Sequence, residues 1–183
     1  MKNKTSISEF KPALKFLLTF VGTYLVGNIL YGLFVEYYKP APDPLTILVT
    51  DQTAYVLTKL EEPVKSIISV IGPIVALRNA DRTVLNVFEG CNGLNVMIVF
   101  ASFLFAFGGG TRRMMIFLFT GCLILHTANI LRLFLLYLTA IHRPLYFYYF
   151  HKYFFTAVLY LVVFGLWLLW MRMNSRKSEP VKA

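Results

Sequence analysis

Residues 153–171 read YFFTAVLYLVVFGLWLLWM and contain no charged side chain. A helix of this length is about 28 Å long, which matches a hydrocarbon core of about 30 Å. Three further apolar stretches lie at residues 14–34, 91–107 and 114–138. The sequence therefore predicts an all-α polytopic membrane protein with about four transmembrane helices, folded as a single membrane-embedded domain over residues 1–183.

The overall composition also favours a membrane protein. Of the 183 residues, 57% are apolar and only 15% are charged, whereas soluble globular chains are about 45–50% apolar and roughly 25% charged. The net charge of +9 comes from Lys and Arg residues that cluster between the apolar stretches, as in membrane topologies and unlike a nucleic-acid surface. The lipid bilayer is therefore an expected partner, and nucleic acid is not.

The distribution of charge predicts an orientation in the membrane. Basic residues precede the first stretch, join the second to the third and follow the fourth: Lys2, Lys4, Lys11, Lys15, Arg112, Arg113, Arg172, Arg176, Lys177 and Lys182. Since cytoplasmic segments are enriched in Lys and Arg, we expect both termini to be cytoplasmic. Seven of the nine acidic residues lie within residues 35–90, so this insert is predicted to be extracytoplasmic.

The insert has its own predicted structure. Apolar residues between Val49 and Ile71 recur at near-helical spacing, which indicates an amphipathic helix on the membrane or on the bundle, kinked or split at Pro63. An alternative is that residues 64–77 dip into the bilayer. Residues 74–88, with Asn79-Ala80-Asp81 in the middle, predict a short β-hairpin that leads the chain to Glu89.

Arg132 is an unusual residue because it lies inside the third apolar stretch. An Arg at the centre of a spanning helix costs about 2.5–3.5 kcal/mol on insertion scales, so a function or a partner must offset this cost. Asn129 is three residues earlier on the same helical face, and His126 lies one turn before it. The helix is therefore predicted to present a polar stripe inward.

Cys91 stands where the predicted hairpin meets the second apolar stretch, in the sequence Glu89-Gly90-Cys91-Asn92-Gly93. The start of a helix favours a thiolate, so we expect a lowered pKa for Cys91. Cys122 lies deep in the third stretch and is predicted to be structural, with no disulfide between the two cysteines.

Two of the three histidines, His142 and His151, fall in the predicted loop before the last span, on the same side of the membrane as Cys91. His126 is buried more deeply and is expected to hydrogen-bond a neighbouring helix. The spacing of His and Cys matches no metal motif, so neither a metal nor a cofactor is predicted. A thiol, an imidazole and a guanidinium on one side of a membrane are suited to acyl transfer.

The motifs Glu89-Gly90-Cys91-Asn92-Gly93 and Asn129-Ile130-Leu131-Arg132, followed by His151 before the last span, resemble the exosortase/archaeosortase family, most closely its short F-type exosortases. The resemblance covers roughly residues 74–170. It implies a membrane cysteine transpeptidase or protease of the bacterial inner membrane that acts through a thioacyl intermediate.

By this match Cys91, Arg132 and His151 are the catalytic residues, and Asn129, Asn92 and Glu89 support them. The implied substrates are exported proteins with a C-terminal sorting tail, which consists of a short motif, one transmembrane helix and a basic end. His142 is the reserve candidate for the catalytic histidine.

A hypothesis from another class is a non-catalytic membrane partner or transporter subunit. In that protein Arg132, Asn129 and His126 would form a polar network between helices. It predicts that Cys91 can be replaced without consequence, whereas the enzyme hypothesis predicts that Cys91→Ala abolishes tail removal.

Overall fold

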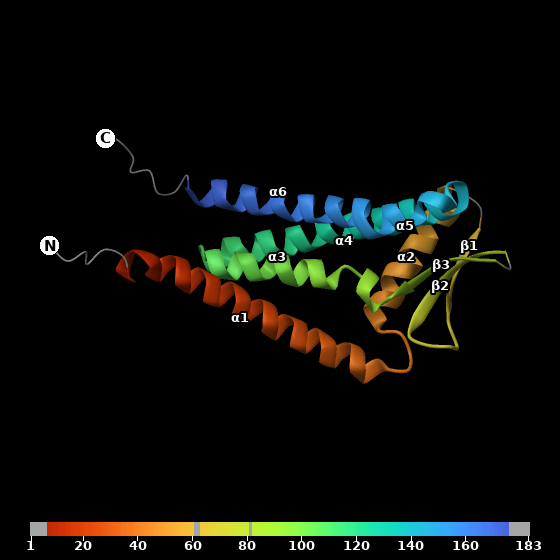
Figure 1. The fold of residues 1–183 in the computed structure, drawn as a ribbon, viewed down its shortest axis with the longest axis horizontal. Coiled ribbons are helices and arrows are strands. Elements are labelled where there is room, and N and C mark those ends of the chain that lie inside the picture. Colours follow the sequence, from red (N-terminus) through yellow and green to blue (C-terminus); the bar gives the residue numbers. More distant parts are fainter. Residues whose placement is uncertain (1–6, 61–62, 81, 176–183) are drawn as a thin grey trace.

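The computed structural model describes residues 7–60, 63–80 and 82–175. Its helices are α1 (Ile7–Tyr38), α2 (Pro44–Leu60), α3 (Leu94–Phe107), α4 (Thr111–His142), the short α5 (Phe147–Tyr149) and α6 (Phe155–Ser175). Its strands are β1 (Val64–Ile68), β2 (Ile74–Asn79) and β3 (Arg82–Phe88). Figure 1 shows α1, α3, α4 and α6 along the long axis of the molecule, with α2 and the strands gathered at one end, which we call the sheet end.

Three helices are long and apolar enough to cross a membrane, among the residues that the structure describes. They span Phe10–Tyr38, Thr111–His142 and Pro144–Ser175, and they contain the predicted stretches 14–34, 114–138 and 153–171. The prediction of a helical membrane protein is thereby confirmed. The fourth predicted span, 91–107, differs because α3 has only 14 residues and is about 21 Å long.

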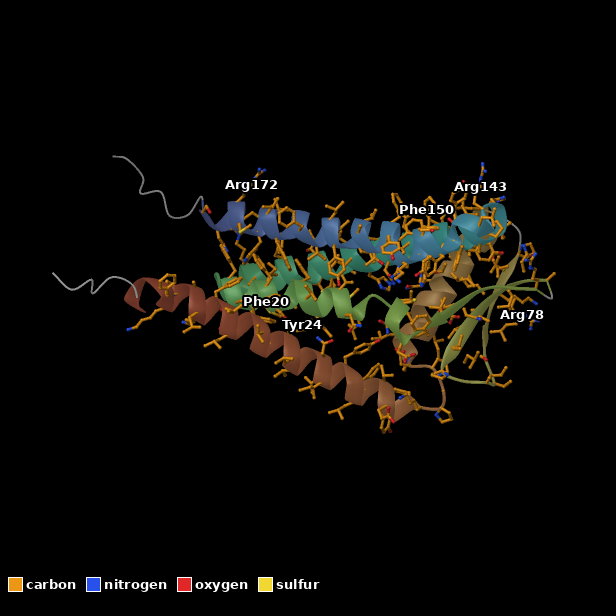
Figure 2. The ribbon with its side chains drawn as sticks, in the orientation of Figure 1. Phe20, Tyr24, Arg78, Arg143, Phe150 and Arg172 are labelled. Atoms are coloured by element: carbon orange, nitrogen blue, oxygen red, sulfur yellow. The ribbon has the colours of Figure 1, made fainter. Side chains whose placement is uncertain are left out.

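Basic side chains lie at both ends of the bundle that the long apolar helices form. Figure 2 shows Arg78 and Arg143 at the sheet end and Arg172 at the opposite end.

The break between α3 and α4 is also at the opposite end, where Gly108 and Gly109 have φ values of 76° and 141°. Glycine adopts such values without the Cβ clash that other residues meet, so the chain can reverse its direction between α3 and α4.

The insert contains one helix and a three-stranded antiparallel sheet in the order β1-β2-β3. The predicted hairpin is confirmed as β2 and β3. The prediction that the amphipathic helix continues through residues 64–71 is wrong because Val64–Ile68 form β1. The alternative that residues 64–77 dip into the bilayer stays a prediction. Helix α2 ends at Leu60, before Pro63, and the β-branched residues that follow pair with β2.

Helix α2 begins at an N-cap that Asp43 provides. The Asp43 carboxylate accepts hydrogen bonds from the backbone N–H groups of Leu45 and Thr46, each at 3.0 Å. Pro44 follows it in the first helical position, where a missing N–H has no cost. This cap fixes where α2 starts above the bundle.

Two clusters of buried apolar side chains hold the molecule together. The cluster at the sheet end joins α2, the sheet and α4 through residues such as Leu57, Leu77, Val87 and Leu133, and it includes Cys91. The other cluster lies between α3, α4 and α6 and includes Trp170. Cys91 therefore lies in the cluster where the insert meets the membrane helices.

Candidate active site

Cys91 lies in a single 3₁₀ turn, η1 (Glu89–Cys91), between the end of β3 and the start of α3. The turn begins as Phe88 leaves the sheet in an extended conformation, and it ends at Asn92. The Asn92 side-chain carbonyl accepts a hydrogen bond of 3.0 Å from the backbone N–H of Leu94, a local turn typical of Asn. The sheet and α3 therefore fix the Cys91 thiol between them, with only 4% of the residue exposed.

Asn129 of α4 holds this turn from the other side. Its side-chain N–H₂ group donates a hydrogen bond of 2.9 Å to the Cys91 carbonyl, and Asn129 is completely buried. Gly93 lies directly against it at a φ of 83°, and a Cβ there would stand 3.0 Å from Asn129 Cγ. The Cys91-Asn92-Gly93 sequence and Asn129 are thus parts of one packed unit, with glycine required at residue 93.

Arg132 follows Asn129 by three residues and lies on the same side of α4. Its guanidinium is close enough to act electrostatically on both the Cys91 thiol and the His151 imidazole. Within the described part of the chain, Arg132 forms no ion pair, and its buried Nε has no hydrogen-bond partner. Arg132 is half-buried, and a charge that is partly removed from water without an ion-pair partner can be stabilised by a negatively charged group.

His151 lies in η3 (Phe150–Phe154), a π-helical turn between α5 and α6. Such turns carry an extra residue in the helix and are frequent at functional sites. The imidazole stacks on the Phe147 ring with centroids 5.7 Å apart. Its buried Nδ1 has no hydrogen-bond partner among the described residues, so this nitrogen is free to exchange a proton.

The predicted low pKa of the Cys91 thiol is not found. Burial raises the pKa of Cys91 above its ordinary value, while the Arg132 charge and a hydrogen bond with the Phe88 backbone lower it and the Glu89 carboxylate raises it. Burial outweighs the favourable terms because the thiolate loses its hydration. The thiol is therefore neutral at rest, and Arg132 is its main source of anion stabilisation.

Asn92 and Glu89, predicted as supporting residues, face a second network on the α1 side of the turn. The Tyr31 hydroxyl donates a hydrogen bond of 2.6 Å to the Glu89 carbonyl and accepts one of 2.9 Å from the Asn92 side chain. Asn92 also donates to the Thr46 hydroxyl at 3.4 Å, which donates to Asp43 at 2.5 Å. The Asn92 side chain and the Glu89 carbonyl thus link the turn to α1 and α2.

Sequence reasoning missed Tyr31 and Thr46 in this network. Tyr31 is one aromatic residue among many in an apolar helix, so no sequence signal distinguishes it. The Asp43-Pro44 pair before a helix was a usable N-cap signal for this region.

The remaining candidate residues have other surroundings. His126 hydrogen-bonds Gln52 of α2 at 2.7 Å, which confirms the expected contact with a neighbouring helix. His142 is exposed at the end of α4, about 15 Å along the helix from Arg132. Cys122 is half-buried and packs against the other cluster.

The polar stripe of α4 is thus divided among different partners, since His126 bonds Gln52 and Asn129 bonds the Cys91 carbonyl. Comparison with known proteins adds no further assignment: no family model, curated protein or solved structure matches this chain.

Proposed function

We propose that this protein is a membrane cysteine transpeptidase or peptidase, similar to the exosortases, with Cys91 as the nucleophile. The observation that carries the proposal is the placement of Arg132, which acts on both the thiol and the imidazole and has no ion-pair partner in the described part of the chain. A cation in this position would stabilise the thiolate and then the oxyanion of an acyl-transfer reaction.

Because the pKa of Cys91 is raised, the thiol must lose its proton before it can attack, and His151 is the proposed base for this first step. The imidazole removes the thiol proton, and the thiolate sulfur attacks the scissile carbonyl carbon of the substrate tail. Arg132 stabilises the resulting oxyanion. The imidazolium then gives its proton to the leaving amine as the C–N bond breaks, which leaves the acyl group on Cys91 as a thioester.

The second step releases the acyl group. An acceptor amine attacks the thioester and forms a new amide in a transpeptidase, whereas water forms a carboxylate in a peptidase. His151 carries the proton from the attacking group to the departing Cys91 sulfur, which restores the neutral thiol. Asn129 keeps the Cys91 backbone in place throughout, because its hydrogen bond is to the carbonyl and not to the reacting sulfur.

The proposed location is the bacterial inner membrane, with both termini cytoplasmic and the sheet end extracytoplasmic. This orientation is supported by α1 beginning and α6 ending at the same end of the molecule (Figure 1). Helix α4 also begins at this end, and its first turn contains Arg112 and Arg113. The proposed substrates are exported proteins whose C-terminal tail has a short motif, one transmembrane helix and a basic end.

The test is processing of such a tail in cells that produce the protein. We expect Cys91→Ala to abolish tail removal while the variant stays inserted and abundant, and Cys122→Ala to leave it unchanged. His151→Ala should be equally defective, whereas His142→Ala should not. Normal processing by Cys91→Ala would refute the enzyme and favour the non-catalytic membrane partner.

A further inference from the structure

The turn between β1 and β2, residues 69–73, exposes two large apolar side chains. Val70 is 100% exposed and Ile71 is 92% exposed, which are the highest values among the exposed large hydrophobic residues that the structure describes. Neighbouring residues in β1 extend this surface, since Ile67 and Ile68 are 40% and 52% exposed. Isolated exposed apolar residues are ordinary, but a contiguous group at the tip of a turn indicates an interaction surface.

The position of this turn along the molecule indicates its partner. Figure 1 shows the β1–β2 turn at the level of the loop that joins α1 to α2 and of α5 across the molecule. Tyr37, in the last turn of α1, is 82% exposed, and the segment around α5 exposes Tyr146, Tyr148 and Tyr149. Exposed Tyr residues at one level of a helical membrane protein are typical of the membrane–water interface.

The chemistry of the turn suits this environment. The backbone N–H of Ile71 donates to the Ser69 hydroxyl at 3.2 Å, and the Ile74 N–H donates to the Gly72 carbonyl at 2.7 Å. Pro73 has no N–H, so few donors of the turn would lose water on insertion. The sequence from residue 63 to 80 contains two basic residues, Lys65 and Arg78, and no acidic residue, so anionic headgroups would not repel it.

We propose that the β1–β2 turn docks on the lipid bilayer, with Val70 and Ile71 inserted at the boundary between headgroups and acyl chains. The contact sets the height of the sheet above the membrane. Because β3 continues directly into the turn of Cys91, it also sets the height of the thiol. The proposal concerns the lipid contact alone and does not depend on the proposed enzyme activity.

The test measures lipid contact at single positions of the full-length chain. Val70→Cys and Ile71→Cys are labelled with an environment-sensitive fluorophore in a background with Cys91→Ser and Cys122→Ser, and reconstituted in phosphatidylcholine/phosphatidylglycerol vesicles. Thr83→Cys is the matched control, because it is exposed and lies beside the β2–β3 turn, farther along the long axis (Figure 1). Quenching by lipids that carry a nitroxide near the headgroup is recorded for each position.

We expect severalfold stronger quenching at residues 70 and 71 than at residue 83, together with a blue-shifted emission. Quenching at the level of the control would overturn the proposal. Crosslinking between two copies through residue 70, without quenching, would also overturn it and would assign the turn to a protein contact. Loss of tail processing in Cys91→Ala bears on the proposed enzyme alone, so the two proposals fail separately.

Discussion

Replacing Gly93 by Ala should open the Cys91 turn. The new residue would have to keep a φ of 83°, and the left-handed region costs a residue with a Cβ about 1–2 kcal/mol. Its Cβ would also stand 3.0 Å from Asn129 Cγ and 3.1 Å from Asn129 Nδ2, closer than ordinary contact. Together these terms amount to about 2 kcal/mol, or roughly a 30-fold larger population of the open turn.

The assay is the rate of maleimide labelling of Cys91 in detergent-solubilised protein at constant pH. The thiol is buried, so labelling depends on local opening and its rate follows the open population. We expect Gly93→Ala to label roughly 30-fold faster than the wild type. Gly165→Ala is the control, because a Cβ at residue 165 meets nothing within 4 Å, and it should label at the wild-type rate.

A double variant separates the backbone strain at residue 93 from the close contact with Asn129. An Asn129→Ala background removes the contacts with Asn129 Cγ and Nδ2 but keeps the 3.2 Å approach to the Cβ of residue 129 and the backbone strain. Adding Gly93→Ala should therefore accelerate labelling of Cys91 by a smaller factor than it does in the wild type. An equal factor in both backgrounds would refute the packing of Gly93 against Asn129. Wild-type labelling of the single Gly93→Ala variant would refute the strained turn altogether.

Three further variants test the surroundings of the thiol. Labelling of Cys91 in the wild type should increase with pH through and above the ordinary thiol range, because burial raises the pKa of Cys91. Arg132→Gln should move this increase to still higher pH, because it removes the charge that lowers the pKa. An unchanged or lower midpoint pH would contradict the role of Arg132. Tyr31→Phe removes the hydrogen bond to the Glu89 carbonyl and should destabilise the protein by about 1 kcal/mol in detergent unfolding while accelerating the labelling of Cys91. His126→Leu breaks the hydrogen bond to α2 and should cost about 1 kcal/mol in the same unfolding assay without affecting the rate of labelling.

Local signals in the sequence were sufficient to predict three long apolar helices and one hairpin, whereas the predicted span 91–107 contains only the 14-residue α3. Stretches of about twenty apolar residues have few alternatives to a spanning helix, and turn residues at positions 79–81 separate two β-prone runs that form β2 and β3. The prediction of a helix over residues 64–71 is wrong because a short apolar run matches both the helical period and the strand period. Strand β1 exists because β2 lies beside it, which no local pattern reveals.

The candidate site, too, could be predicted from the sequence only in part. The positions of Cys91, Arg132 and His151 relative to the apolar stretches indicated that all three belong to one side of the membrane. The bond from Asn129 to the Cys91 carbonyl and the contacts of Tyr31 join residues 38 and 58 positions apart, so they could not be predicted. The pKa of Cys91 was predicted in the wrong direction because helix position is local, whereas burial depends on the whole cluster around the thiol.

The sequence by itself determined the class of the protein, three of its four predicted membrane spans and the residue types available for acyl transfer. These properties depend on hydrophobicity and charge along the chain, so the local sequence is enough to predict them. Only the tertiary structure decided that Gly93 packs on Asn129, that Arg132 acts on both the thiol and the imidazole, and that the thiol is buried. Each of these depends on distances between separate helices and strands, and such distances exist only once the chain has packed.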